Sequence, residues 1–368
     1  MRPVTSRLLK QLDASIAAAR TPLAVDCLEA ERACYLARQG HLIEAKATIT
    51  RLRRQYLGAP NVEMSAWLSL AEGLESYFGN LGAASHDKIL RAHALSAAAG
   101  LVTMQALSAA WLSQMDFTKL DAENLARHAK QALTLAGPQD HSARSRVSLV
   151  LAQALHVAGR LDIALPWYRR AHFHATAHGD DATISALIHN MACMRLDNLR
   201  QVKLAGVGDA IDGDLVLSGA QSTDNFDQLI GASSMKALKP LLRARILSLQ
   251  GQPAEALILY EEHIAVDVDK GFARMQSDLL SDVAWCHFQI DQRESALYSA
   301  RAAESTLSAE TQIDDRAATH TRLGWLYREL GDFEEAQRHE VLASQAWSTY
   351  IQLQARFVAL LGSVSENG

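Results

Sequence analysis

A short turn signature recurs along the chain and constrains its fold more than any other feature. Six-residue segments such as "GHLIEA", "GRLDIA" and "GDFEEA" each end on an alanine, and successive alanines lie about 40 residues apart except for one wide gap, from Ala164 to Ala256, of about two periods plus a dozen residues. In five of the seven segments a glycine stands five residues earlier, where a left-handed residue ends a helix at little cost. The alanines are Ala45, Ala84, Ala122, Ala164, Ala256, Ala296 and Ala336, and the glycines are Gly40, Gly79, Gly159, Gly251 and Gly331.

The long runs between these turns read as helix. The chain of 368 residues has only 7 Pro and 20 Gly, and Ala, Leu, Gln, Glu and Arg fill most of the runs. Each period therefore predicts two antiparallel helices, and the small alanine lets the second approach the first closely. A single hairpin cannot bury its apolar face, so neighbouring hairpins must stack. The sequence predicts an all-α solenoid of antiparallel helix hairpins, with one long loop interruption.

Two units carry enough of the pattern to resemble a known family. The first set is Ala152, Gly159, Leu161, Ala164, Tyr168 and Ala171, and the second is Leu323, Gly324, Tyr327, Gly331, Phe333 and Ala336. These small and aromatic positions resemble the tetratricopeptide repeat. The period of about 40 exceeds the family's usual length of about 34 and is similar to the longer-helix variants in bacterial regulators of the MalT and Rap types. The resemblance implies a right-handed solenoid whose first helices line a concave groove, and it implies no particular ligand.

The predicted organisation has five parts. They are an N-terminal capping helix in 1–25, repeats in 26–203, an acidic loop insertion in 204–234, repeats in 235–350, and the end of a terminal helix with a tail in 351–368. The loop has five Gly, five Asp and no Lys or Arg. It lacks the spacing and closing Glu of a calcium loop, so it is either a solvated acidic loop or a segment that contacts a partner.

The C-terminal helix and the cysteines leave further expectations. The apolar stripe of the terminal helix continues beyond what a hairpin partner needs, so this helix either caps the array or forms a homodimer contact. Cys27, Cys34, Cys193 and Cys286 form no Cys-x-x-Cys pair, which favours buried free thiols. The first residues lack the apolar core of a signal peptide, and no segment has the roughly 18 apolar residues of a membrane span. We expect a cytoplasmic protein without a membrane partner.

Several function classes are disfavoured. The formal net charge is −5 and there is no dense basic stripe, which argues against direct nucleic-acid binding. The chain has no phosphate-binding Gly-Lys-Ser/Thr loop, no Gly-x-Ser-x-Gly elbow and no His-Glu-x-x-His motif. His174 and His178 are four residues apart, but no third ligand accompanies them. We therefore expect no enzyme activity, no cofactor and no metal.

Three tryptophans share one position relative to the turn. Trp111, Trp285 and Trp325 each precede an aligned alanine by eleven residues and follow a small residue. By resemblance to tetratricopeptide proteins this position lines the concave groove, where Trp is well suited to binding. The alternative is that the rings pack between adjacent repeats.

Other candidate groove residues lie in the same first-helix register or one turn from it. They are Gln153, His156, His189, Asn190, Arg245, Phe288, Gln289, Arg328 and Glu329. Aromatic rings, the guanidinium groups of Arg and side-chain amides together suit the binding of an extended peptide. The sequence predicts a non-enzymatic scaffold that binds a protein or peptide partner. The alternative is a ligand-responsive regulatory module that controls a partner protein.

Overall fold

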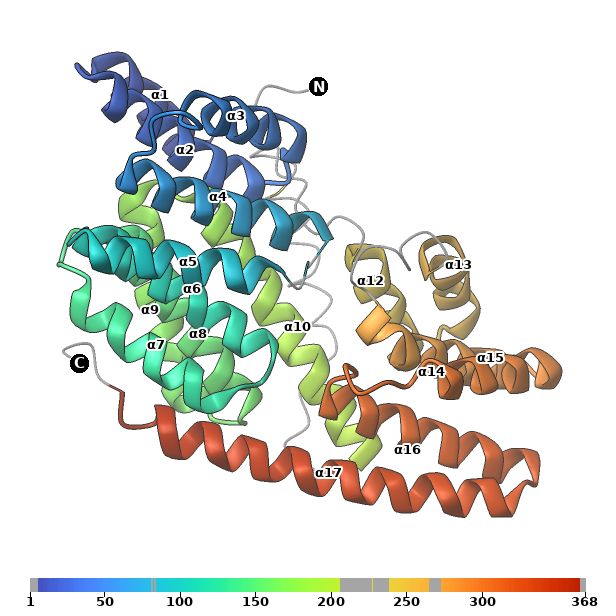
Figure 1. Cartoon of the computed structure of the whole chain (residues 1–368). Helices are drawn as coiled ribbons and strands as arrows, with labels where there is room; N and C mark the ends of the chain where they lie inside the picture. Colours follow the sequence, from blue (N-terminus) through green and yellow to red (C-terminus); the bar gives the residue numbers. More distant parts are fainter. Residues whose placement is uncertain are drawn as a thin grey trace. The chain divides into compact units, whose positions relative to one another are not determined.

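The chain is built from helices throughout the part that the structure describes, which is residues 6–80, 82, 84–205, 227, 238–264 and 273–364 of a computed structural model. Figure 1 shows these helices as successive hairpins. They are α1 (Arg7–Ala18), α2 (Pro22–Arg38), α3 (Leu42–Gln55), α4 (Val62–Asn80), α5 (Ala84–Ala98), α6 (Val102–Thr118), α7 (Ala122–Leu135), α8 (His141–Val157), α9 (Leu161–His178), α10 (Asp181–Ala205), α12 (Leu238–Leu249), α13 (Pro253–Ile264), α14 (Ala273–Gln289), α15 (Arg293–Ser305), α16 (Ile313–Leu330) and α17 (Phe333–Leu361).

The helices pair as the repeat predicts. Close contacts join α2 with α3, α4 with α5, α6 with α7, α8 with α9, α12 with α13, and α14 with α15. The α16–α17 hairpin is held by Leu323 and Ala336, which belong to one buried cluster. The predicted class, an all-α array of antiparallel helix hairpins, is confirmed. The predicted loop at 204–234 falls almost entirely outside the described residues.

The turn glycines explain where most first helices end. Gly40, Gly159, Gly251 and Gly331 all have positive φ values, which an L-residue with a Cβ adopts only at a cost. Gly79 differs because it lies inside α4. Asp291 takes the glycine position before α15 with a φ of 62°, and a short polar side chain tolerates this conformation better than most.

The turn between α6 and α7 differs from the prediction. Here Leu120 holds the left-handed position, with a φ of 56°. Asp121 then caps α7, and its side chain accepts a hydrogen bond from the Asn124 amide at 3.1 Å. The residue five positions after the left-handed one is therefore Leu125, so the alignment on Ala122 was wrong by three residues. A leucine in a glycine position and a small residue at the start of α7 together produced the error.

The chain divides into two compact units, which are described separately. Unit 1 comprises residues 1–190, 222–235 and 357–368, and unit 2 comprises 191–221 and 236–356. Helices α10 and α17 each have residues in both units. The five-part organisation predicted from the sequence remains a prediction.

Unit 1 closes on itself through its first helix. The Leu8 amide donates to the Gly179 carbonyl oxygen at 3.1 Å, and Arg7 forms an ion pair with Asp181 at 2.9 Å. The turn between α9 and α10 is thereby joined to α1. The core of the unit includes apolar residues from α1, α2, α4 and α6. The sequence predicts that α1 is a capping helix. In the structure α1 also contacts the turn between α9 and α10.

Unit 2 has smaller cores between successive hairpins. One contains Leu241, Tyr260 and Leu279, and another contains Ala284, Leu323 and Tyr327. In α16, a Cβ on Gly324 would lie 3.5 Å from the Ala336 carbonyl oxygen. A small residue therefore permits the close approach of α16 and α17, as the repeat pattern predicts.

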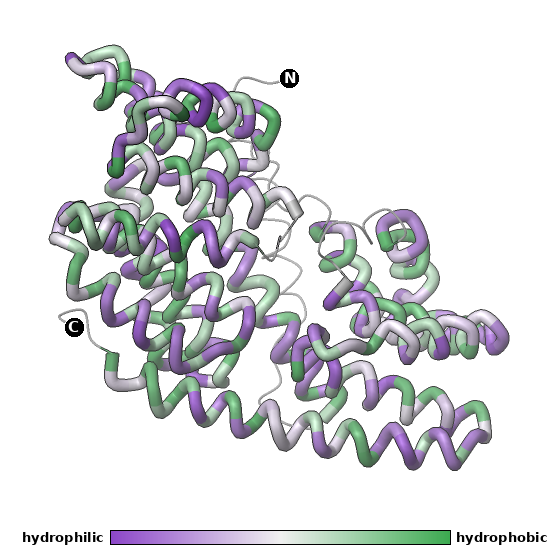
Figure 2. Tube along the Cα trace, in the orientation of Figure 1, coloured by the Kyte–Doolittle hydropathy of each residue, from purple (hydrophilic) through white to green (hydrophobic). Residues whose placement is uncertain are grey.

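Two whole-chain features follow. All four cysteines are free, and three of them are buried. No helix in the described part of the chain is long and apolar enough to cross a membrane. Figure 2 shows why, because hydrophobic and hydrophilic residues alternate along each helix instead of forming one continuous apolar rod.

Candidate binding site

Two tryptophans meet on successive first helices of unit 2. Trp285 of α14 and Trp325 of α16 each lie eleven residues before the alanine of their repeat. Their ring centroids are 5.8 Å apart with planes inclined by 60°, and both rings are partly exposed. The two rings thus touch each other between adjacent repeats and also keep a surface open to solvent. The pair therefore has the contact between repeats that one alternative expected, and the other alternative, that the rings line a groove, remains a prediction.

Neighbouring side chains extend this surface. Phe288 lies 5.6 Å from Trp285 in a tilted stack, and the Arg322 guanidinium lies 5.6 Å from the Trp285 ring. One turn beyond the tryptophans, Gln289 and Glu329 are exposed. We call the surface of Trp285, Phe288, Gln289, Trp325 and Glu329 the tryptophan face.

The predicted cation beside this face is already paired. Arg328 is exposed, and its Nε donates to Glu340 at 3.0 Å. Its guanidinium could reach a ligand only by leaving that carboxylate.

A buried ionic network lies on the same first helices. Asp278 and Asp282 of α14 are 0% and 1% exposed. Arg245 of α12 contacts both carboxylates, and its Nε lies 3.1 Å from Asp282. Arg200 of α10 lies 2.7 Å from Asp278, and Arg322 of α16 lies 3.2 Å from Asp282. This arginine–aspartate network ties four helices together, so Arg245 supports the structure instead of facing a ligand.

The charges of the network set the pKa values of its members. Burial disfavours the ionised form of Asp282, but Arg200, Arg322 and Arg245 outweigh it and hold the pKa of that carboxyl at about 2. Burial raises the pKa of Asp197 to about 6, and the arginines only partly offset this effect. Burial also raises the pKa of Asp315, which lies near Asp278 and Asp314. Asp282 is therefore held in its ionised form, whereas burial opposes the ionisation of Asp197 and Asp315.

The predicted site residues of unit 1 lie in a different setting. Trp111 is only 2% exposed. The corrected alignment places Gln114 in the position of Trp285 and Trp325, since it precedes Leu125 by eleven residues, and Gln114 is also buried. Trp111 therefore sits three residues outside the shared register. Its ring carries the Arg146 guanidinium at 4.0 Å, which places it in the interior of unit 1.

The other unit 1 candidates are also mainly internal. Gln153 of α8 is buried, and its Oε1 has no hydrogen-bond partner among the described residues. His156 is buried, and its Nδ1 lies 3.1 Å from the Tyr168 hydroxyl of α9, so it joins the two helices of its hairpin. His189 and Asn190 on α10 are half-buried. Within unit 2 the structure brings Trp285, Phe288 and Trp325 together, whereas within unit 1 Trp111, Gln153 and His156 are buried.

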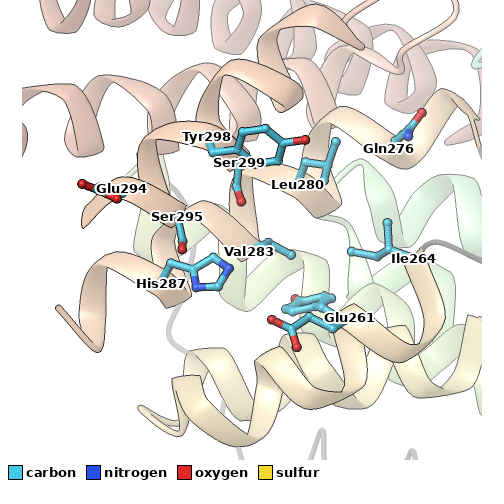
Figure 3. A pocket seen from close by; sticks show the side chains of 11 residues that line it. Glu261, Ile264, Gln276, Leu280, Val283, His287, Glu294, Ser295, Tyr298 and Ser299 are labelled. Carbon is cyan, nitrogen blue, oxygen red and sulfur yellow. The ribbon is translucent and has the colours of Figure 1, made fainter. Parts of the chain in front are cut away.

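A separate cavity of about 590 Å³ lies among α13, α14 and α15. Ile264, Leu280 and Val283 supply aliphatic walls, and Figure 3 shows side chains from all three helices around the opening. Glu261 and Glu294 also line it, and neither has an ion-pair partner in the described part of the chain. This volume is within the range of small-molecule sites.

One group of side chains has the composition of a metal site. Ligand atoms of Glu304, Glu335 and His339 lie within 4.8 Å of one another. However, Arg338 pairs with both carboxylates, and its Nη2 lies 3.1 Å from the His339 Nε2. The guanidinium thus takes the place that a cation would occupy. The His339 Nδ1 lies 2.9 Å from the His320 Nδ1, which fixes the orientation of the ring.

The comparison with known families agrees with the hairpin geometry. A family model described as tetratricopeptide repeat matches residues 145–170 and 317–339. These ranges cover the α8–α9 and α16–α17 turns with parts of the flanking helices. No curated protein matches the chain. The described part of the chain is all-helical, and two of its hairpins match the tetratricopeptide repeat, a kind of repeat that generally serves protein interaction and is typically not catalytic.

Sequence reasoning missed the ionic network under the tryptophan face. Asp278 and Asp282 are four residues apart and therefore share one face of α14 with Trp285. That spacing was available as a signal. Their partners Arg200 and Arg322 are 78 and 40 residues away in sequence from Asp278 and Asp282 respectively, so no local pattern relates them.

Proposed function

We propose that the protein is a non-enzymatic scaffold and that the tryptophan face of unit 2 binds an extended segment of a protein partner. The observation that carries the proposal is the pair of partly exposed rings, Trp285 and Trp325, at 5.8 Å on successive first helices. Partly exposed indoles leave some apolar area in water, and Trp is enriched among residues that dominate binding energies.

The surroundings of the pair indicate what kind of segment would fit. The rings would receive an apolar or aromatic side chain of the partner. Gln289 and Glu329 are exposed one turn away and can bond to the amides and carbonyls of an extended backbone. The arginine–aspartate network beneath the rings fixes the relative positions of α14 and α16 through Arg322 and Asp282. The segment would then meet a preformed surface, which lowers the entropic cost of binding.

A selection experiment tests the proposal. Peptides selected from a random display library on the full chain would be titrated against the wild type and a Trp285→Ala/Trp325→Ala variant by fluorescence anisotropy. We expect a loss of affinity of at least tenfold, since hot-spot truncations cost about 2 kcal/mol or more. A matched control is Trp67→Ala, a partly buried tryptophan of unit 1. Equal affinity of the folded double variant would refute the proposal. If the double variant unfolds by circular dichroism, Trp→Phe replacements at the same positions retain packing and repeat the test.

A second candidate function is the ligand-responsive regulatory module, favoured by the cavity among α13, α14 and α15. Its aliphatic walls and the carboxylates of Glu261 and Glu294, which have no ion-pair partner among the described residues, suit a small organic cation with an apolar body. Benzylamine and the neutral benzyl alcohol would be compared by isothermal titration. Preferential binding of the amine that is lost in Glu261→Gln/Glu294→Gln would favour this function. Equal or absent binding of both probes would argue against it.

A further inference from the structure

Unit 1 contains a buried guanidinium whose charge is not balanced. Arg146 of α8 is 6% exposed, and its Nε has no hydrogen-bond partner among the residues that the structure describes. The one hydrogen bond given for its guanidinium runs from Nη2 to the Thr183 hydroxyl, at a long 3.5 Å. Its other neighbour is the face of the Trp111 ring at 4.0 Å.

Asp180, the carboxylate whose charge acts on Arg146, is committed to another arginine. Both oxygens of Asp180 accept from the Arg38 Nη2, at 2.8 and 2.7 Å. The same oxygens also accept from the Thr183 amide and hydroxyl at 2.9 Å. Arg38 additionally donates to the Thr183 hydroxyl at 2.6 Å and lies 5.7 Å from the Trp111 ring. Among the residues that the structure describes, two guanidinium groups therefore share one aromatic ring and one carboxylate, which leaves a formal charge of +1.

Such an arrangement is unstable without a counter-charge. Burying a charge without a partner is costly, and removal of one partner from a buried pair strongly destabilises a protein. Burial and the neighbouring Arg38 lower the pKa of Arg146 to about 9. At neutral pH the guanidinium still carries its proton, so deprotonation does not remove the charge.

We infer that Arg146 forms the centre of an anion-binding site inside unit 1 that takes a small oxyanion, either a phosphate or a carboxylate group. A guanidinium presents Nε and Nη donors in a planar fork that matches two oxygens of such an anion. Arg146 is only 6% exposed, which favours a free small ion over a folded partner. Such an ion would supply both the missing hydrogen bond and the missing negative charge.

The site is independent of the tryptophan face, since all of its residues belong to unit 1. Asp180 follows Gly179, whose carbonyl oxygen accepts from the Leu8 amide where unit 1 closes. An anion beside Arg146 would thus stabilise the region where α1 joins the α9–α10 turn.

The test measures anion-dependent stability of the full chain. Thermal unfolding would be followed in chloride, acetate and inorganic phosphate at equal ionic strength, for the wild type and Arg146→Met. We expect phosphate or acetate to raise the wild-type midpoint relative to chloride, and the variant to show no such difference. A response to phosphate alone or to acetate alone identifies which oxyanion is bound. In chloride, Arg146→Met should unfold at a higher temperature than the wild type, because the unbalanced charge is gone.

Two further variants keep the inference open to refutation. Arg170→Met removes another arginine that lies over a tryptophan ring in unit 1, at 4.6 Å from Trp167, and should keep the wild-type response. Arg146→Lys keeps the charge but loses the planar fork, and should bind phosphate or acetate at least tenfold more weakly in isothermal titration. The inference is overturned if neither anion stabilises the wild type relative to chloride. It is also overturned if Arg146→Met, or Arg146→Lys should the former not fold, retains the full response.

Discussion

Replacing Asp282 by Asn would test whether the arginine–aspartate network holds unit 2 together. Asn has nearly the same size as Asp but carries no charge. The Asp282 carboxylate lies 3.1 Å from Arg245, 3.2 Å from Arg322 and 3.4 Å from Arg200. Arg200 and Arg245 would keep Asp278 as a partner. In the described part of the chain, Asp282 is the one carboxylate that forms an ion pair with Arg322. The Arg322 guanidinium would therefore lose its counter-charge.

The expected loss follows from this difference among the arginines. Breaking a buried ion pair costs about 3–5 kcal/mol. Since two of three arginines keep a carboxylate, we expect the lower end, about 3 kcal/mol. For a region of this size, 1 kcal/mol shifts the unfolding midpoint by roughly 2–4 °C, so the variant should melt roughly 6–12 °C below the wild type.

Urea unfolding monitored by circular dichroism would measure the loss, and calorimetry would show which transition moves. Asp291→Asn is the matched control, because its side chain is exposed and Asn also tolerates a left-handed backbone. It should stay within about 0.5 kcal/mol of the wild type. The Asp282→Asn/Arg322→Met double variant should be less destabilised than the sum of the two single variants. An Asp282→Asn protein within about 1 kcal/mol of the wild type, or strict additivity, would refute the reasoning.

The pH dependence of the same pair has a defined sign. The folded-state pKa of Asp282 is lowered to about 2, so its contribution is fully present above the unfolded pKa of about 3.9 and is lost as the pH falls through about 2. The stability difference between the wild type and Asp282→Asn should therefore persist at pH 5 and shrink below about pH 4.

Three other changes have expected outcomes. Asp197→Asn should stabilise the protein at pH 7 but not at pH 4. Burial raises the pKa of Asp197 to about 6, so the stability of the wild type falls as the pH rises from about 3.9 to 6. Urea midpoints at both pH values test this. Leu120→Gly should stabilise the protein by about 1 kcal/mol and Gly159→Ala should destabilise it by a similar amount, since both positions have positive φ; thermal unfolding that shows the reverse order would contradict the assignment of the turn. Burial raises the pKa of all four cysteine thiols, to about 12 for Cys27 and about 11 for Cys286, so Ellman's reagent at pH 8 should label them slowly until urea unfolds the chain, and rapid labelling of the native protein would contradict this.

The fold was accessible from the sequence because its signals are local. A glycine that ends a helix and a small residue five positions later lie within one turn, so a single sequence displays both. The weakness of this logic appears at Leu120, where a leucine adopts the left-handed conformation that the pattern reserves for glycine. Without a glycine to mark the end of α6, the sequence pattern indicates Ala122 as the aligned residue. A shift of three residues is nearly one helical turn, which was enough to place buried Trp111 in the same class as Trp285 and Trp325.

The candidate site was accessible only in part. The register of Trp285 and Trp325 follows from counting along each repeat, and the two rings do meet. The carboxylates beneath them do not follow from counting, because Arg200 lies on α10, before the interruption, and Asp278 lies on α14, after it. The repeat pattern is interrupted between those helices, so the sequence offers no register to carry across the gap.

Arg245 shows how one register position serves two purposes. It precedes Ala256 by eleven residues, as Trp285 and Trp325 precede Ala296 and Ala336. An indole in this position can remain partly exposed, because its apolar face and single N–H tolerate both water and protein contact. A buried guanidinium in the same position must be neutralised, and the carboxylates that do so come from the next first helix, three and seven residues before its own tryptophan. When the repeat that follows an arginine in this position has acidic residues three and seven positions before its own register residue, the sequence therefore predicts that the arginine forms an internal ion pair. Without such an acidic pair, the arginine is a better candidate for a ligand contact.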